Sequence, residues 1–103
     1  MLASFAVLPF GAGEELKELV AESLSIVEKS GLNYRLGAMQ TTLEGDSDEV
    51  MSVIMQCHKR VLELVPRVLT NITIDDRKGA TNRLIGKVTD VESVLGRELK
   101  HEE

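Results

Sequence analysis

Acidic side chains are the residues of this chain that could most directly attract a charged ligand, and they gather in two places. One group is Glu44 with the segment that begins at Asp46 and ends at Glu49, and the other is the pair Asp75 and Asp76. Asp46 and Glu49 have a simpler role, because an Asp followed three residues later by a Glu is typical of a helix start. Asp75 and Asp76 also fit a solvated turn. Glu44 differs from these residues because it ends a predicted strand.

The neighbouring Cys57 and His58 do not have the pattern of a metal site or of a nucleophilic pair. Consecutive residues of a helix point about 100° apart, and the other histidine of the chain is His101, in the tail. Cys57 lies on the apolar stripe of its predicted helix, so we expect it to be buried and unreactive. We expect no metal and no cofactor.

The composition excludes several classes of partner. The chain has 17 acidic and 12 basic residues, whereas a surface that binds nucleic acid needs clustered Lys and Arg. The apolar start, Leu2 to Phe10, lacks a basic leader and is too short to span a bilayer. The single Cys57 allows no intrachain disulfide and fits a reducing, cytoplasmic compartment. The length of 103 residues predicts one domain, residues 1–103, and two Phe and one Tyr predict an aliphatic core.

A β-hairpin must position the residues around Glu44. Two short runs typical of strands, Tyr34–Leu36 and Thr41–Glu44, lie on either side of Gly37, which provides the backbone freedom of a tight turn. Strands this close in sequence pair antiparallel, because a parallel pair needs a crossover of about a dozen residues or more.

The segments outside the hairpin predict two more strands and three helices. Leu2–Phe10 is apolar on both alternating sets, which is typical of a central strand, and its pairing should end at Pro9 because proline cannot donate to a ladder. The last strand is predicted over Val68–Ile74. Apolar residues at helical spacing predict helices over Glu14–Lys29, Ser47–Leu64 and Asn82–Leu99, the last capped by Thr81.

This order of elements predicts an α+β fold, a ferredoxin-like βαββαβ sandwich with an extra C-terminal helix. Both main helices then cover one face of a four-stranded antiparallel sheet, and the other face is bare. The first strand is apolar on that face too, and Leu69 adds to it. An exposed apolar patch of this size is unusual for a monomer, so we expect a homodimer or homotetramer to which the third helix contributes contacts.

Enzymes that share this fold class offer a comparison. Acylphosphatase holds phosphate with an Arg in the loop after its first strand, but here no Arg precedes Arg35. A phosphohistidine mechanism needs a sheltered His, which neither histidine offers. The segment Gly11-Ala12-Gly13 before a helix suggests phosphate binding, but no Lys, Ser or Thr follows at the spacing of a P-loop. We expect no enzymatic activity and retain a ferredoxin-like enzyme as an alternative.

The hairpin also resembles a known family. The similarity is carried by the string Tyr34-x-Leu36-Gly37-x-Met39-x-Thr41-x-x-Glu44-Gly45-Asp46, by Ile74-Asp75-Asp76-Arg77, and by Val7-Leu8-Pro9 followed by Gly11. These residues are similar to the thiamine-binding, YkoF-like family, and the resemblance covers most of the chain through Arg77. Ala38 departs from the pattern, because the family often has Pro there, and the departure loosens the turn.

The resemblance implies a ferredoxin-like fold, dimers or tetramers, and non-catalytic binding of thiamine or of its hydroxymethylpyrimidine part. The thiazolium cation of such a ligand would favour a carboxylate, and its aminopyrimidine needs an acceptor beside a donor. Phe10 could stack on the pyrimidine, or it could instead pack on the first helix. Hydroxyl and amide groups in the strands could supply the polar contacts, although Thr in strands also reflects β-propensity.

We expect the ligand where the Pro9–Phe10 corner, the Gly37–Thr41 turn and the tail of the last strand could converge. The residues expected to bind it are Phe10, Gly37, Met39, Thr41, Glu44, Asn71 and Asp75. The main alternative is a structural or partner-binding oligomer that has no small ligand.

Overall fold

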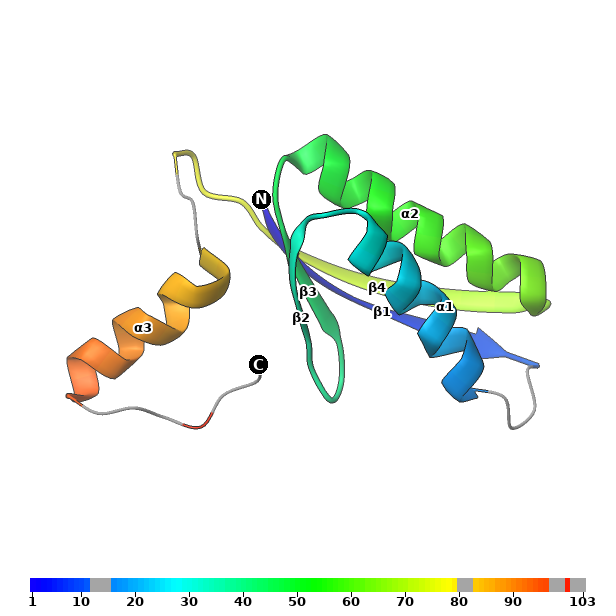
Figure 1. The fold of residues 1–103 in the computed structure, drawn as a ribbon, viewed down its shortest axis with the longest axis horizontal. Coiled ribbons are helices and arrows are strands. Elements are labelled where there is room, and N and C mark those ends of the chain that lie inside the picture. Colours follow the sequence, from blue (N-terminus) through cyan, green and yellow to red (C-terminus); the bar gives the residue numbers. More distant parts are fainter. Residues whose placement is uncertain (12–15, 80–82, 97–99, 101–103) are drawn as a thin grey trace.

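The computed structural model describes residues 1–11, 16–79, 83–96 and 100 (Figure 1). Its strands are β1 (Leu2–Phe10), β2 (Asn33–Leu36), β3 (Thr41–Glu44) and β4 (Arg67–Asp75), and its helices are α1 (Leu16–Lys29), α2 (Ser47–Leu64) and α3 (Arg83–Leu95). This order confirms the predicted α+β, ferredoxin-like fold with an extra C-terminal helix. The predicted starts of the first and third helices, the Thr81 cap and the predicted end at Leu99 lie outside the described residues.

The four strands form one antiparallel sheet in the order β2-β3-β1-β4, so β1 is central, as predicted. β1 pairs with β4 along its whole length, but it pairs with β3 only over Leu2 to Phe5. Phe5 lies opposite Thr41, the first residue of β3. Among the described residues, the edge of β1 that faces β3 therefore has no strand beside it beyond Phe5.

The predicted end of pairing at Pro9 is wrong on the β4 side, where Pro9 still lies opposite Val68. Proline is tolerated within a sheet where its missing N–H falls on an edge without a ladder partner. β1 has such an edge at this position, because its pairing with β3 has already ended at Phe5.

Helices α1 and α2 lie side by side on one face of the sheet (Figure 1). The core between them and the sheet is mostly aliphatic, as predicted. The largest fully buried side chains of the described residues are Leu43, Ile54, Val27, Val50, Val61 and Cys57. The predicted bounds of α2 are confirmed: the Asp46 carboxylate accepts a hydrogen bond from Asp48 N at 3.2 Å, and Pro66 follows the C-cap residue.

Helix α3 packs beside β2 and β3 (Figure 1), and in the described part of the chain the other two strands keep exposed apolar side chains on the second sheet face. Its neighbours Asn33 and Arg35 belong to the alternate set of β2 that points away from α1 and α2. On β1 and β4, exposed apolar side chains remain on this second face. They are Leu8, Phe10 and Leu69, and α3 itself exposes Ile85, Val91, Val94 and Leu95.

Candidate ligand-binding site

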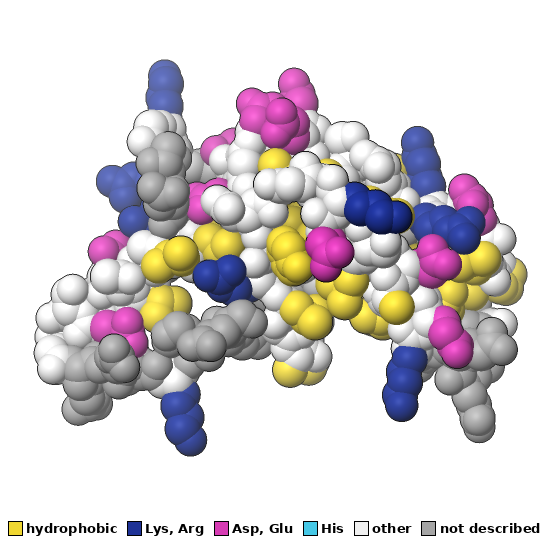
Figure 2. All heavy atoms as spheres, in the orientation of Figure 1, with side chains coloured by type: hydrophobic (Ala, Val, Ile, Leu, Met, Phe, Trp, Pro, Cys, Tyr) yellow, Lys and Arg dark blue, Asp and Glu magenta, His cyan; other side chains and the backbone are white. Residues whose placement is uncertain are grey.

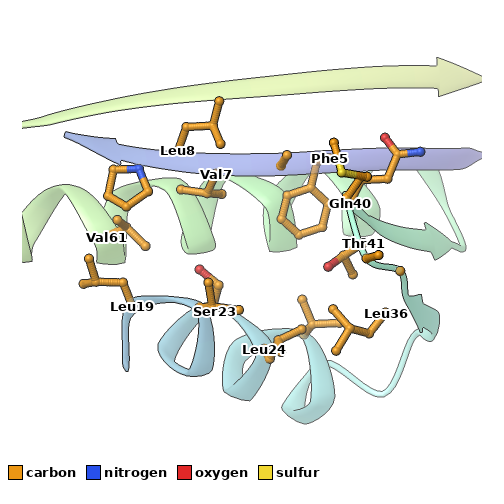
Figure 3. Close-up of a pocket in the computed structure, with 17 residues that line it drawn as sticks. Phe5, Val7, Leu8, Leu19, Ser23, Leu24, Leu36, Gln40, Thr41 and Val61 are labelled. Atoms are coloured by element: carbon orange, nitrogen blue, oxygen red, sulfur yellow. The ribbon is translucent and has the colours of Figure 1, made fainter. Parts of the chain in front are cut away.

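A cavity of about 220 Å³ lies between α1, β1 and the turn that joins β2 to β3 (Figure 3). We call it the hairpin cavity. Its lining consists of residues 5–9 of β1, residues 36–41 of the hairpin, Leu19, Val20, Ser23, Leu24 and Val27 of α1, and Val61 of α2. The cavity exists because β3 stops pairing at Phe5, so the unpaired edge of β1 is bordered by side chains of α1 and by the hairpin turn.

The walls of the cavity are mainly apolar, and hydrophobic side chains are visible between α1 and the hairpin (Figure 2). Phe5 provides the aromatic ring of the lining, and that ring borders the space between α1 and β1 (Figure 3). Aromatic faces of this kind stack on planar ligands. None of the described residues that line the cavity carries a charge.

Three polar side chains line the cavity: Ser23, Gln40 and Thr41. Ser23 is only 9% exposed and Thr41 only 8%, and their oxygens both point into the space between α1 and β1 (Figure 3). Gln40 is exposed at the mouth. Among the described residues, the Ser23 hydroxyl is a buried side-chain oxygen that has no hydrogen-bond partner. Such an unsatisfied group costs about 1–3 kcal/mol of stability, so a ligand that bonds to it would recover that cost.

Cys57 lies behind Ser23 and is fully buried, and its Sγ donates to the Ser23 carbonyl oxygen at 3.4 Å. Burial raises the pKa of the Cys57 thiol from 9.0 to about 11 because the thiolate would lose its hydration. The thiol is therefore protonated near neutral pH, and the prediction of a buried, unreactive cysteine is consistent with this environment.

Of the residues that we expected to bind the ligand, three line the hairpin cavity: Gly37, Met39 and Thr41. Met39 is 86% exposed at the tip of the hairpin. Phe10 lies just past the lining residue Pro9, but its ring is 42% exposed, and the Arg67 guanidinium lies over it at 4.9 Å from the ring centre. Phe10 therefore does not form a wall of the cavity.

The predicted convergence with the tail of the last strand is wrong. Antiparallel pairing places both Glu44 and Asp75 opposite Leu2, at the far end of β1 from Phe10. Eight strand residues separate these ends by about 26 Å, at roughly 3.3 Å per residue. Asn71 lies opposite Ala6, on the face away from the helices, because its neighbour Thr70 contacts His58 of α2.

Glu44 instead holds the start of α3. Its carboxylate accepts hydrogen bonds from Arg83 N at 2.6 Å and from Leu84 N at 3.2 Å. Backbone N–H groups at a helix N-terminus lack partners within the helix, and the helix dipole favours a negative charge there. The contacts of Glu44 are thus explained by the attachment of α3 to the sheet.

The expected site omitted Phe5 and Ser23, although the sequence contains a signal for each. Ser23 lies four residues from both Leu19 and Val27, so a polar residue occupies a core position of the α1 stripe. Phe5 lies two residues after Ala3, so both side chains point to the face of β1 that the helices cover.

Known proteins are similar to this chain over most of its length, including the hairpin. A family model described as thiamine-binding protein matches residues 3–92, which include the whole hairpin and most of α3. The chain belongs to the thiamine-binding protein family. The family identified by the residues of the hairpin is thereby confirmed.

Relatives of this family member are widespread. A UPF0045 protein of Mycobacterium tuberculosis is 40% identical over 96 residues, which cover 92% of this chain and 94% of that protein. A UPF0045 protein of Methanocaldococcus jannaschii is 32% identical over 88 residues, which cover 85% and 88% of the two chains. The similarity thus spans nearly all of each protein.

Solved structures share the fold. A hypothetical protein from Methanocaldococcus jannaschii aligns with a TM-score of 0.81 and 31% identity, over 87% of this chain and 93% of that one. A Thermotoga maritima protein provisionally assigned to thiamine biosynthesis or salvage aligns with a TM-score of 0.75 over 87% and 96% of the chains. Its identity of 23% supports the fold alone.

In the described part of the chain, no three His, Cys, Asp or Glu side chains are grouped so that they could hold a metal ion. No helix in those same residues is both long and apolar enough to cross a membrane.

Proposed function

We propose that this family member binds thiamine through its pyrimidine ring, or hydroxymethylpyrimidine itself, in the hairpin cavity, and that it does so without catalysis. The observation that carries the proposal is the cavity itself, in which an aromatic ring and two buried hydroxyls converge. It lies at the turn that contains Gly37, Met39 and Thr41 of the family string.

The proposed contacts match the chemistry of an aminopyrimidine. The Phe5 ring offers a face for stacking, and the hydroxyls of Ser23 and Thr41 can each donate and accept a hydrogen bond. Stacking and a few hydrogen bonds suit a micromolar affinity, which corresponds to about −8 kcal/mol. In this proposal, Phe10, Glu44, Asn71 and Asp75 lie outside the pyrimidine site.

Isothermal calorimetry with thiamine and with hydroxymethylpyrimidine tests the proposal. Thr41→Val keeps the shape of the side chain and removes its hydroxyl. The binding free energy should therefore become less favourable by about 0.5–1.5 kcal/mol. Thr73→Val is the matched control, because Thr73 is an exposed strand threonine that does not line the cavity. The proposal is wrong if the unaltered protein binds neither compound, or if Thr41→Val and Thr73→Val bind equally well.

Self-association is the second part of the proposal, and the exposed apolar residues of the second sheet face support it. Leu8, Phe10 and Leu69 lie on β1 and β4, whereas α3 packs chiefly on β2 and β3. Exposed apolar patches of this kind mark interaction sites, so a homodimer or homotetramer would bury them. A purely structural or partner-binding oligomer is the alternative function that the same face supports. A cytoplasmic location suits the free thiol of Cys57.

A further inference from the structure

We propose that the outer edge of β4 pairs with the same edge of a second copy, antiparallel about a two-fold axis at Asn71, so that two four-stranded sheets join into one. This interface is separate from the apolar second sheet face, because it uses backbone groups at the rim of the sheet. It does not depend on the ligand of the hairpin cavity. The inference follows from an unprotected strand edge, from charges that match in one register, and from an apolar stripe of α2 beside that edge.

Strand β4 lacks the usual protection of an edge strand. Among the described residues its only strand partner is β1, and their one-to-one pairing over nine residues contains no bulge. Its sequence has neither Pro nor Lys, which commonly block edge strands. Pro9 directs its backbone toward the β3 side, so Val68 opposite it directs its own backbone away from β1. By alternation, the residues whose N–H and C=O groups point outward are Val68, Thr70, Ile72 and Ile74.

The charges of β4 select one register for this pair. An axis at Asn71 places the exposed Arg67 opposite Asp75 of the second copy, and the two-fold symmetry forms this ion pair twice. An axis one residue later places Arg67 opposite Arg77, which is a like charge, and an axis one residue earlier places it opposite an uncharged threonine. Opposite charges across a strand pair are stabilising and like charges are destabilising. The axis at Asn71 is therefore favoured.

A stripe of α2 beside the edge supports a second copy independently. His58 Nδ1 lies 2.7 Å from Thr70 Oγ1, so the side of α2 that carries His58 faces β4. Residues at helical spacing from His58 share that side, namely Met51, Met55 and Leu62. Met55 is 40% exposed and Leu62 46%. Because Asn71 follows Thr70, an axis there brings the middle of this stripe against the same stripe of the second copy, where both become buried.

A second copy fits this edge better than an unrelated extended peptide. A peptide strand would satisfy the outward backbone groups of β4, but a second copy also supplies the two ion pairs and the matching apolar stripe. The β4 edge lies on the opposite side of β1 from the hairpin cavity. Pairing at this edge therefore leaves the cavity open.

Disulfide formation in Asn71→Cys tests the position of the axis. The two copies of position 71 would form a pair without hydrogen bonds, with about 4.5 Å between their Cα atoms, a distance at which disulfides form. We expect most of the oxidised protein to be a covalent dimer on a non-reducing gel. Thr73→Cys is the matched control, because its side chain lies on the same face but its two copies would be about 13 Å apart. Equal cross-linking of the two variants, or none in either, would overturn the proposed axis.

Sedimentation of charge variants tests the register. Arg67→Asp places like charges opposite each other in both pairs, so the dissociation constant of the dimer should rise at least about tenfold. Arg67→Asp combined with Asp75→Arg restores opposite charges and should recover most of the affinity. Lys17→Asp, at an exposed lysine of α1, controls for the change in net charge and should leave the constant unchanged.

The outcomes separate this interface from association through the second sheet face. A double variant that dissociates as readily as Arg67→Asp refutes the register. If the protein self-associates but neither the charge variants nor the choice of cysteine position changes the result, the β4 edge is not the interface, and association through the second face still stands. A monomer at micromolar concentration refutes both.

Discussion

Replacing Glu44 by Ala should loosen α3 without affecting the hairpin cavity. The Glu44 carboxylate accepts from Arg83 N at 2.6 Å and from Leu84 N at 3.2 Å, so the substitution leaves two N–H groups of the first turn without their acceptor. Loss of a side-chain cap and of a negative charge at a helix N-terminus costs about 1–2 kcal/mol. Helix α3 has 13 residues and, among the described residues, packs chiefly on β2 and β3, so its packing offsets little of this loss.

Hydrogen exchange of the α3 amides measures this effect directly. A loss of about 1–2 kcal/mol should accelerate their exchange by a factor of about 5–30, while the amides of α2 keep their protection. Glu28→Ala, at an exposed glutamate of α1, is the control. Unchanged exchange in α3 would refute the anchoring role of Glu44. If Glu44→Ala instead binds thiamine more weakly while the α3 amides stay protected, Glu44 contacts the ligand.

Three more predictions concern the core, the thiol and the second sheet face. Ile54→Ala should lower the free energy of unfolding in urea by about 2–5 kcal/mol, because Ile54 is fully buried; a smaller loss would contradict its place in the core. Burial raises the pKa of the Cys57 thiol to about 11, so the stability that it contributes is complete below pH 9 and is lost as pH rises toward 11. Denaturation at pH 8 and pH 10 should therefore show a larger drop in the unaltered protein than in Cys57→Ala, and equal drops would exclude this contribution. Leu69→Lys should increase the monomer fraction in sedimentation, and an unchanged fraction would place the self-association surface elsewhere.

Local signals in the sequence were sufficient for the elements that end at strong caps. The bounds of α2 were predicted to the residue, because Asp46 provides an N-cap acceptor and Pro66 cannot continue a helix. The strands of the hairpin were predicted to within one residue, since Gly37 separates two short strand-like runs and only the start of β2 differs, at Asn33 instead of Tyr34. In these cases the residues that determine the structure are neighbours along the chain.

The composition of the site could be predicted only in part, because it depends on which residues lie opposite each other in the sheet. Glu44 and Asp75 are both paired with Leu2, a consequence of strand register that side-chain types alone do not reveal. The cavity also depends on β3 ending opposite Phe5, beyond which one edge of β1 has no strand partner in the described part of the chain. From the sequence, Ser23 resembles an ordinary polar helix residue; its burial without a hydrogen-bond partner among the described residues is visible only in the structure.

A titration of the protein with hydroxymethylpyrimidine, followed by the chemical shifts of assigned backbone amides, tests the central claim most directly. Phe5 and Thr41 each lie three strand residues from the end of the sheet that holds Glu44 and Asp75, which is about 10 Å at the rise per strand residue, so their amides report on separate places. The proposed function predicts saturable shifts at Phe5, Ser23 and Thr41, with Glu44 and Asp75 unchanged. Shifts confined to Glu44 and Asp75, or no shifts at any concentration, would contradict it.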